Sequence, residues 1–356
     1  MSRNFNVAIV GYGLAGKVFH GPLIKWTEGL NVSSIVCRAA EKQEQARKDF
    51  PDAKIVSDFA AVLNPAQTDL VVIATPNTEH TPQALAAMKA GIAVVIDKPA
   101  AISAAECREL IECMKQTKML LSIFQNRRWD NDFLCIKKLI AENKLGKILR
   151  YESRFERYRP IPKTDAWREK LGSEEGGGLL FDLGSHLIDQ ATQLFGKPEQ
   201  VYAEMNCRRA GVKSDDDSFV ALSFESGVKA HLWMSAISAS QGHRFRVIGT
   251  DGAYEKYGLD PQEESLRQGR TPADADWGTE PEANWAKLTQ YDDNGQKILS
   301  VVPSLPDTYQ CFYETMRDAM RGSCAVPVAV EEALLTLEII EAARKSAQTK
   351  SAVACK

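Results

Sequence analysis

The chain has 356 residues, of which 26% are charged, and a formal net charge of −3 at pH 7. This length suggests about two domains, and the near balance of charge argues against nucleic acid or an anionic membrane as a partner. No apolar run approaches the ~20 residues that span a bilayer, and Met1 to Asn6 lack the apolar core of a signal peptide. The eight cysteines include no C-x-x-C pair, and none shares a zinc spacing with the five histidines. We therefore expect a cytoplasmic protein with reduced thiols and no metal site.

The N-terminal part of the chain begins with a nucleotide-binding pattern. Phe5–Val10 is an apolar run typical of a buried strand, and G-x-G-x-x-G follows it before a predicted helix. In this context the first glycine permits a tight turn, the second lets the backbone approach a pyrophosphate, and the third lets helix and strand pack closely. We therefore predict a dinucleotide site with contacts from Gly11, Gly13, Leu14, Ala15 and Gly16.

The residue after the second predicted strand, Val32–Cys37, bears on the choice of cofactor. A carboxylate there would hold the ribose 2′-hydroxyl of NAD, whereas this chain has Arg38. A guanidinium can bind a 2′-phosphate with two hydrogen bonds, so we expect NADP rather than NAD. The alternative is that Arg38 is a solvated surface residue and that Glu41 contacts the ribose.

Strands and helices continue to alternate up to residue 124. This alternation predicts a doubly wound parallel sheet with right-handed crossovers, and we assign residues 1–124 to a Rossmann domain. The further predicted strands are 54–56, 70–74, 92–96 and 119–124, and the predicted helices are 40–49, 59–63, 83–90 and 104–117.

A polar loop, Thr75-Pro76-Asn77-Thr78-Glu79-His80, follows the predicted strand 70–74. Ligands of open parallel sheets bind beyond the carboxyl ends of the strands, so we expect this loop to contact the cofactor. The alternative for the histidine is a structural hydrogen bond at the start of a helix. The predicted contacts are Thr75, Pro76, Asn77 and His80.

A second loop at the same edge contains Asp97-Lys98-Pro99. Proline restricts the backbone of the residue before it, so Lys98 is directed by the chain itself. A lysine here could orient a substrate hydroxyl and stabilise developing negative charge, and both Lys98 and Pro99 would border the cofactor. The alternative is that Lys-Pro only ends the strand at the surface.

The pattern changes after Phe124, and we assign residues 125–356 to a second, α+β domain. Short connections between its strands predict an open, mainly antiparallel sheet, which can leave one face for a partner subunit. We read residues 258–294 as a surface excursion, and the last helix, 330–346, can pack back on the first domain. The predicted strands are 148–158, 200–207, 218–224, 228–234 and 244–248.

One helix of this domain carries two stripes of side chains. The apolar stripe predicts an amphipathic helix, and the polar stripe brings Asp182 and His186 together four residues apart. A carboxylate that orients an imidazole is an arrangement typical of a general base. The bland alternative is a solvated polar face. Metal binding by this pair is disfavoured, because the sequence offers no third ligand.

These motifs, in this order, resemble the Gfo/Idh/MocA oxidoreductase family over nearly the whole chain. The resemblance implies a Rossmann domain, a C-terminal sheet that builds a homodimer or homotetramer, and a catalytic set of Lys98, Asp182 and His186. The chain departs at Asp97, where the family usually has glutamate. Stretches such as Val18–Leu23, 126–134 and 256–260 resemble the family's NADP-dependent scyllo-inositol dehydrogenases, although neighbouring subgroups share many of them.

The resemblance implies hydride transfer between a nicotinamide and a secondary alcohol or ketone of a cyclic polyol or sugar. Trp167 and Arg168 join the cofactor site on the same grounds, and the substrate site draws on Lys98, Arg127, Tyr158, Asp182 and His186. Two alternatives keep the fold: transient redox chemistry that enables hydrolysis or elimination, and an NADPH-binding sensor without catalysis.

Overall fold

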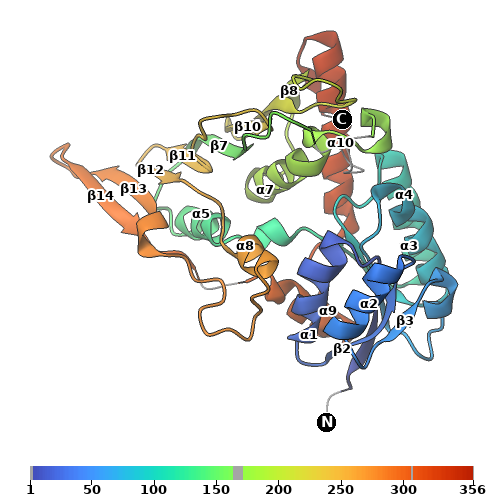
Figure 1. Cartoon of the computed structure of the whole chain (residues 1–356). Helices are drawn as coiled ribbons and strands as arrows, with labels where there is room; N and C mark the ends of the chain where they lie inside the picture. Colours follow the sequence, from blue (N-terminus) through green and yellow to red (C-terminus); the bar gives the residue numbers. More distant parts are fainter. Residues whose placement is uncertain (1–2, 163–170, 306–307, 356) are drawn as a thin grey trace. The chain divides into compact units, whose positions relative to one another are not determined.

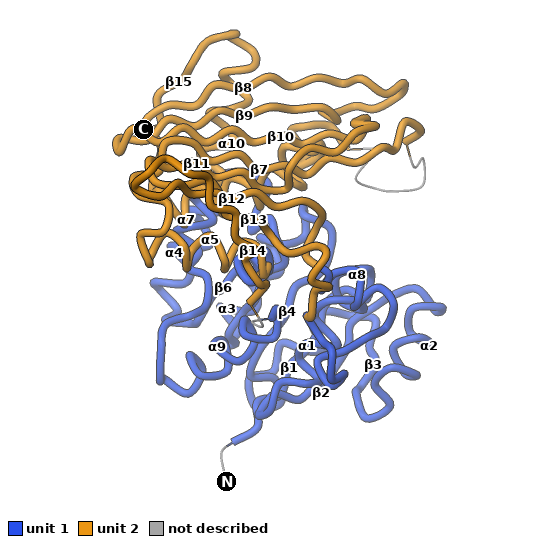
Figure 2. The backbone as a smooth tube through the Cα atoms, turned by 90° about the vertical axis from the view of Figure 1, so that its left-hand side faces the viewer, with its two compact units in different colours: residues 1–129, 261–278, 308–334 blue, residues 130–260, 279–307, 335–356 orange. Residues whose placement is uncertain are grey.

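The computed structural model describes residues 3–162, 171–305 and 308–355. Contacts divide the chain into two compact units, which Figure 2 shows in different colours. Unit 1 comprises residues 1–129, 261–278 and 308–334, and unit 2 comprises residues 130–260, 279–307 and 335–356. Each unit is therefore assembled from three separate stretches of the chain.

Unit 1 contains a six-stranded, all-parallel sheet in the order β3-β2-β1-β4-β5-β6. The prediction of a doubly wound parallel sheet is confirmed. The strand order reverses between β1 and β4, which is where doubly wound sheets bind their ligands. The strands are β1 (Phe5–Val10), β2 (Leu30–Val36), β3 (Lys54–Val56), β4 (Leu70–Ile73), β5 (Ala93–Asp97) and β6 (Leu121–Phe124).

Continuous apolar runs explain why the central strands of this sheet are buried on both faces. All four residues of β4 are fully buried, as expected for a parallel sheet with helices on both sides. The helical segments before residue 130 are η1 (Ala15–His20), α1 (Gly21–Lys25), α2 (Ala40–Asp49), η2 (Phe59–Val62), η3 (Asn77–Glu79), α3 (His80–Lys89), α4 (Ala104–Thr117) and η4 (Asn126–Trp129).

Two later segments complete unit 1. Helix α8 (Gln262–Arg267) comes from the segment predicted to be a surface excursion, and it packs against η1. Helix α9 (Gln310–Met320), which the sequence analysis missed, buries Phe312, Tyr313 and Met316. The prediction of a surface excursion over 258–294 is therefore wrong in part, since Gln262 and Leu266 of α8 are buried and the segment also contains η7 (Glu282–Asn284) and strand β13.

Unit 2 contains a nine-stranded sheet in the order β14-β13-β12-β11-β7-β10-β9-β8-β15. Neighbouring strands are antiparallel except for β7 and β10, which run parallel, so the predicted mainly antiparallel sheet is confirmed. The strands are β7 (Ile148–Glu156), β8 (Gln200–Asn206), β9 (Asp217–Ser223), β10 (Lys229–Ser235), β11 (Phe245–Gly249), β12 (Gly252–Lys256), β13 (Ala286–Tyr291), β14 (Lys297–Val302) and β15 (Val353–Ala354).

Helices α5 (Asn131–Ala141) and α7 (Ser185–Phe195) lie along one face of this sheet (Figure 1). Strand β9 alternates buried and half-exposed residues, so Val220 and Leu222 face the helices and Phe219 points to the other face. Helix α10 (Val330–Thr349) begins in unit 1 and continues in unit 2. Across the parts of the chain that the structure describes, no helix is both long and apolar enough to cross a membrane.

Candidate active site

The glycine loop of unit 1 is shaped by close backbone contacts on one side and open space on the other. A Cβ on Gly16 would lie 2.0 Å from the carbonyl oxygen of Gly11, and a Cβ on Gly11, where φ is +98°, would lie 2.5 Å from that of Ala74. A Cβ on Gly13 would meet no described atom within 4 Å, and Leu14 is exposed. The residues therefore fit a dinucleotide whose phosphates approach at Gly13.

Cationic side chains gather at the end of β2. Arg38 is exposed there, and the charges of Lys42 and Arg47 act on the neighbouring Cys37 thiol. Burial nevertheless raises the pKa of Cys37, so the thiol stays protonated near neutral pH. Glu41, the alternative ribose partner, lies exposed in the first turn of α2. The positive charge favours an additional phosphate at this end of the strand.

The loop after β4 is held by its own side chains. The Thr75 hydroxyl donates to Oε1 of Gln83 at 3.0 Å, and buried Asn77 opens the turn η3 after Pro76. His80 at the end of this loop is buried. Its Nε2 lies 3.0 Å from the carbonyl oxygen of Thr75, and its Nδ1 lies 2.8 Å from the carbonyl oxygen of Pro99. Its ring nitrogens thus bind the protein backbone, as the structural alternative for His80 anticipated.

Lys98 is half-exposed directly after β5, and its peptide bond to Pro99 is cis. Its backbone N–H donates to Oδ1 of Asp97 at 3.0 Å. Although burial alone would raise it, the pKa of Asp97 is lowered by the imidazole of His20, 3.8 Å away, and by the charges of Lys98 and His80. The carboxylate that precedes the lysine is therefore ionised at neutral pH, and the aspartate keeps the negative charge of the glutamate that is usual in the family.

Arg127 is buried on η4 and is bound on two sides. Its Nη1 donates to the hydroxyl of Tyr309 at 3.1 Å, and its Nη2 pairs with Glu263 of α8. Burial would raise the pKa of Glu263, but Arg127, Arg267 and Lys98 together lower it. Glu263 is therefore a charged neighbour of both Arg127 and Lys98. No sequence pattern indicates this role for Glu263, because α8 lies far along the chain in a segment without clear periodicity.

In unit 2, Asp182 and His186 lie on a helix that starts irregularly. A π-helical turn, η6 (Leu180–Gly184), precedes α7. The sequence predicted a regular amphipathic helix here, and the structure differs in this first turn. His186 is 5% exposed and Asp189 of the same polar stripe is 2% exposed, while Asp182 is half-buried. The ring of His186 packs edge-on against Phe155 of β7. The bland alternative of a solvated polar face is therefore wrong.

Asp215, from the loop before β9, fixes the start of this helix. Its Oδ2 accepts from the backbone N–H of Leu180 and from the hydroxyl of Ser218, both at 2.7 Å, and its carbonyl accepts from Leu179. Gly178 has φ +96°, and a Cβ there would lie 2.0 Å from Oδ1 of Asp215. In the sequence, the run Asp215–Asp217 is the signal that could have indicated this role.

Three predicted site residues remain. Tyr158 is 61% exposed and forms an isolated bridge with Ile237. Trp167 and Arg168 lie outside the described residues. Within the described ranges, no three histidine, cysteine, aspartate or glutamate side chains gather as a metal site would require.

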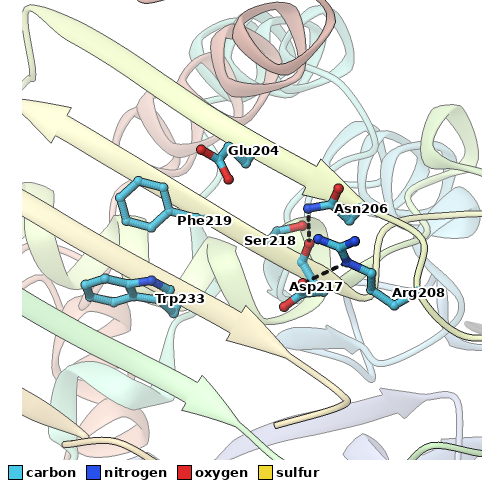
Figure 3. A pocket seen from close by; sticks show the side chains of 7 residues that line it. All are labelled: Glu204, Asn206, Arg208, Asp217, Ser218, Phe219 and Trp233. Atoms are coloured by element: carbon cyan, nitrogen blue, oxygen red, sulfur yellow. Dashed lines mark hydrogen bonds and ion pairs between the residues drawn. The ribbon is translucent and has the colours of Figure 1, made fainter. Parts of the chain in front are cut away.

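A shallow hollow of about 320 Å³ opens on the sheet face that points away from α7 (Figure 3). Phe219 and Trp233 form one side of it, with ring centroids 5.1 Å apart. Arg208 and Asp217 form the other side through an ion pair of 3.2 Å. Because Met234, next to Trp233, contacts the helix start at Gly184, the hollow and the Asp182–His186 helix lie on opposite faces of the sheet.

The two units together define the class of this protein. The family models for the Gfo/Idh/MocA "Oxidoreductase family, NAD-binding Rossmann fold" and "Oxidoreductase family, C-terminal alpha/beta domain" match residues 5–125 and 137–355. The chain belongs to the Gfo/Idh/MocA family and is an oxidoreductase with a nicotinamide-dinucleotide-binding fold.

Similar proteins extend over the full length of the chain. The scyllo-inositol 2-dehydrogenase (NADP(+)) IolW of Bacillus subtilis is 37% identical over 98% of this chain and 95% of its own. The uncharacterized oxidoreductase YdgJ of Escherichia coli is 37% identical over 99% of both chains. The solved structure of the putative oxidoreductase yvaA from Bacillus subtilis superimposes with a TM-score of 0.94 at 36% identity and covers 99% of both chains.

Proposed function

We propose that the protein is an NADP(H)-dependent oxidoreductase that transfers a hydride between nicotinamide and a secondary alcohol or ketone of a cyclic polyol or sugar. Within this class we propose scyllo-inositol and its ketone, scyllo-inosose, as the substrate pair. Support for this choice comes from the full-length similarity to an NADP-dependent scyllo-inositol dehydrogenase and from the resemblance of several sequence stretches to that subgroup.

The cofactor would be held by the edge of the unit 1 sheet. Gly13 and Leu14 would face the pyrophosphate, Arg38 the 2′-phosphate, and the loops at Thr75 and Lys98 the remainder. The exposed guanidinium of Arg38, with Lys42 and Arg47 nearby, favours NADP over NAD. The free thiols fit the cytoplasmic location that we propose.

Three side chains of the protein would transfer the proton and stabilise the reacting oxygen. A bound nicotinamide supplies the hydride acceptor or donor. His186 would take the proton of the substrate hydroxyl, and Asp182 would hold the imidazole in orientation. Lys98 would donate a hydrogen bond to the reacting oxygen and stabilise its negative charge. In ketone reduction His186 would return the proton.

The observation that carries this proposal is the polar stripe on which His186 and Asp189 are buried and Asp182 is half-buried. Burying an imidazole and carboxylates costs free energy, so a helix that only needed a core face would not carry them there. Ionisable groups in such surroundings are typical of functional sites. Their presence in a chain with an intact dinucleotide loop favours acid–base chemistry beside a nicotinamide.

The direct test is a panel of inositols and aldoses assayed with NADP⁺ and NAD⁺ in parallel. We expect absorbance at 340 nm to rise in proportion to ketone formed, with scyllo-inositol and NADP⁺ as the best pair. Product without net cofactor reduction would instead indicate transient redox chemistry. Tight NADPH binding without turnover of any polyol would indicate a sensor, and either result contradicts the proposal.

We also propose that the outer face of the unit 2 sheet carries self-association. Phe219 and Trp233 lie together on this face, and the guanidinium of Arg154 stacks 3.9 Å above the Trp233 ring. Clustered aromatic and arginine side chains are enriched in subunit interfaces. That enrichment supports our proposal of a homodimer or homotetramer formed through this sheet.

A further inference from the structure

The ring of His80 lies between the two loops at the nucleotide edge of unit 1. Its Nδ1 is 2.8 Å from the carbonyl oxygen of Pro99, and its Nε2 is 3.0 Å from the carbonyl oxygen of Thr75. These two oxygens belong to segments that follow different strands, β5 and β4. The residue is 1% exposed, so the ring is enclosed by protein.

The partners of the ring determine its protonation. A carbonyl oxygen only accepts hydrogen bonds, and a neutral imidazole has one N–H and one bare lone pair. A neutral ring would therefore point a lone pair at one of the two oxygens. An imidazolium donates from both nitrogens and satisfies both contacts.

A buried cation also needs an opposite charge nearby. Asp97 supplies it, because the charge of the ring is among those that stabilise the ionised carboxylate. Titratable groups near the ring include Asp97 at the end of β5, Lys98 directly after it, and His20 beside Asp97. Exposed Glu79 directly precedes the ring, and Glu106 accepts from the next residue, Thr81. The Asp97 carboxylate, which interacts with the charge of His80, favours the charged form of the ring.

We propose that His80 is held as an imidazolium whose two N–H groups fasten the loops at Thr75 and Pro99 to each other. His80 is then a positioning residue: it sets the spacing of both nucleotide-facing loops and, through Pro99, the direction of Lys98. The inference rests on the proposed function to the extent that these loops bind the nucleotide. It goes beyond that function by assigning a fixed charge to a residue behind the site.

The protonation state is measurable without substrate, by ¹⁵N NMR of histidine-labelled protein, with His80 assigned from the spectrum of His80→Gln. We expect both His80 nitrogens to remain protonated between about pH 6 and pH 8. His231 and His243 are internal controls, since burial lowers the pKa of both rings and they should be neutral over most of this range. One bare nitrogen on His80, or its titration with the controls, would overturn the proposal.

The positioning role is tested by nucleotide binding to His80→Gln and to the matched variant Thr81→Val. Thr81 is buried one residue later and donates to Oε2 of Glu106 at 2.8 Å, an oxygen that also accepts from the backbone N–H of Ile102 at 3.4 Å. Removing its hydroxyl leaves the contacts of His80 to Thr75 and Pro99 in place. We expect the Kd for NADP⁺ to rise about tenfold or more in His80→Gln, because two charge-assisted hydrogen bonds are lost. Thr81→Val should change it by less than about twofold.

Normal nucleotide affinity in His80→Gln, or equal loss in both variants, would contradict the positioning role. The NMR measurement uses the unaltered protein, so it decides the charge of the ring even if His80→Gln does not fold. If no polyol of the panel is turned over, the proposed substrate is refuted. The NMR and nucleotide-binding measurements on His80 still test the inference made here, because neither needs a substrate.

Discussion

Burial decides what the polar side chains of this protein can do. His186 and His80 are both buried, yet one lies on a polar helix stripe and the other is bound at both nitrogens to the backbone. A solvated imidazole can hydrogen-bond to water, whereas a buried imidazole needs hydrogen-bond partners within the protein. Helical periodicity located His186, and the loop after a predicted strand located His80, but neither signal could separate a chemical role from a structural one.

Arg38 gives a prediction at the residue scale. We expect Arg38→Asp to raise the KM for NADP⁺ by about tenfold to a hundredfold, because a charge-assisted contact to the 2′-phosphate is replaced by repulsion. The KM for NAD⁺ should change little or fall. Arg108→Asp, on α4, makes the same change of charge away from β2 and serves as the control. If Arg38→Asp changed the KM for NADP⁺ and for NAD⁺ equally, the ribose would be bound by another residue, such as Glu41.

Apolar patterns in the sequence predict the buried strands and helices. They do not predict the exposed strand β14 or the long-range contact that caps the Asp182–His186 helix. The predicted strands of unit 1 agree with the structure to within about two residues at each end, because buried parallel strands are continuous apolar runs. Strand β14 is exposed along almost all its length and so shows no alternation that a sequence could reveal. The cap on the Asp182–His186 helix spans 35 residues from Leu180 to Asp215, a distance at which no local pattern operates.

Gly178 gives a prediction at the element scale. Alanine there would need a left-handed φ and would collide with Asp215, whereas Gly211 has φ +78° with no described atom within 4 Å of a Cβ. Both substitutions carry the backbone cost of about 1–2 kcal/mol. We expect Gly178→Ala to lower the free energy of unfolding by at least about 1 kcal/mol more than Gly211→Ala and to reduce kcat as well. Urea unfolding and turnover assays measure both effects, and equal values for the two variants would deny Asp215 its role.

At the scale of the whole molecule, the chain passes between the units several times. Segment 261–278 returns to unit 1 and brings Glu263 to Arg127. The linear order of motifs therefore predicts two domains, but it does not predict which stretches of the chain belong to each unit. Helical spacing indicated the Asp182–His186 pair as a candidate general base, and the resemblance to the family joined it with Lys98 into one catalytic set.

The outer sheet face gives a prediction at this scale. Trp233→Asp should lower the mass of the native particle measured by light scattering, because a charge replaces an aromatic ring in the proposed subunit contact. Trp26→Asp is the control, since Trp26 is 44% exposed in unit 1. An unchanged mass for Trp233→Asp, or a loss for Trp26→Asp alone, would place the contact elsewhere.

The central claim is that His186 moves the substrate proton while unit 1 holds the nucleotide. The most direct measurement compares kcat and the Kd for NADPH in His186→Ala with those of the unaltered protein, with His231→Ala as the control. We predict that kcat falls by about 10²–10⁴ in His186→Ala with nucleotide affinity preserved, and that His231→Ala retains full activity. Undiminished turnover of the polyol substrate by His186→Ala would contradict the account.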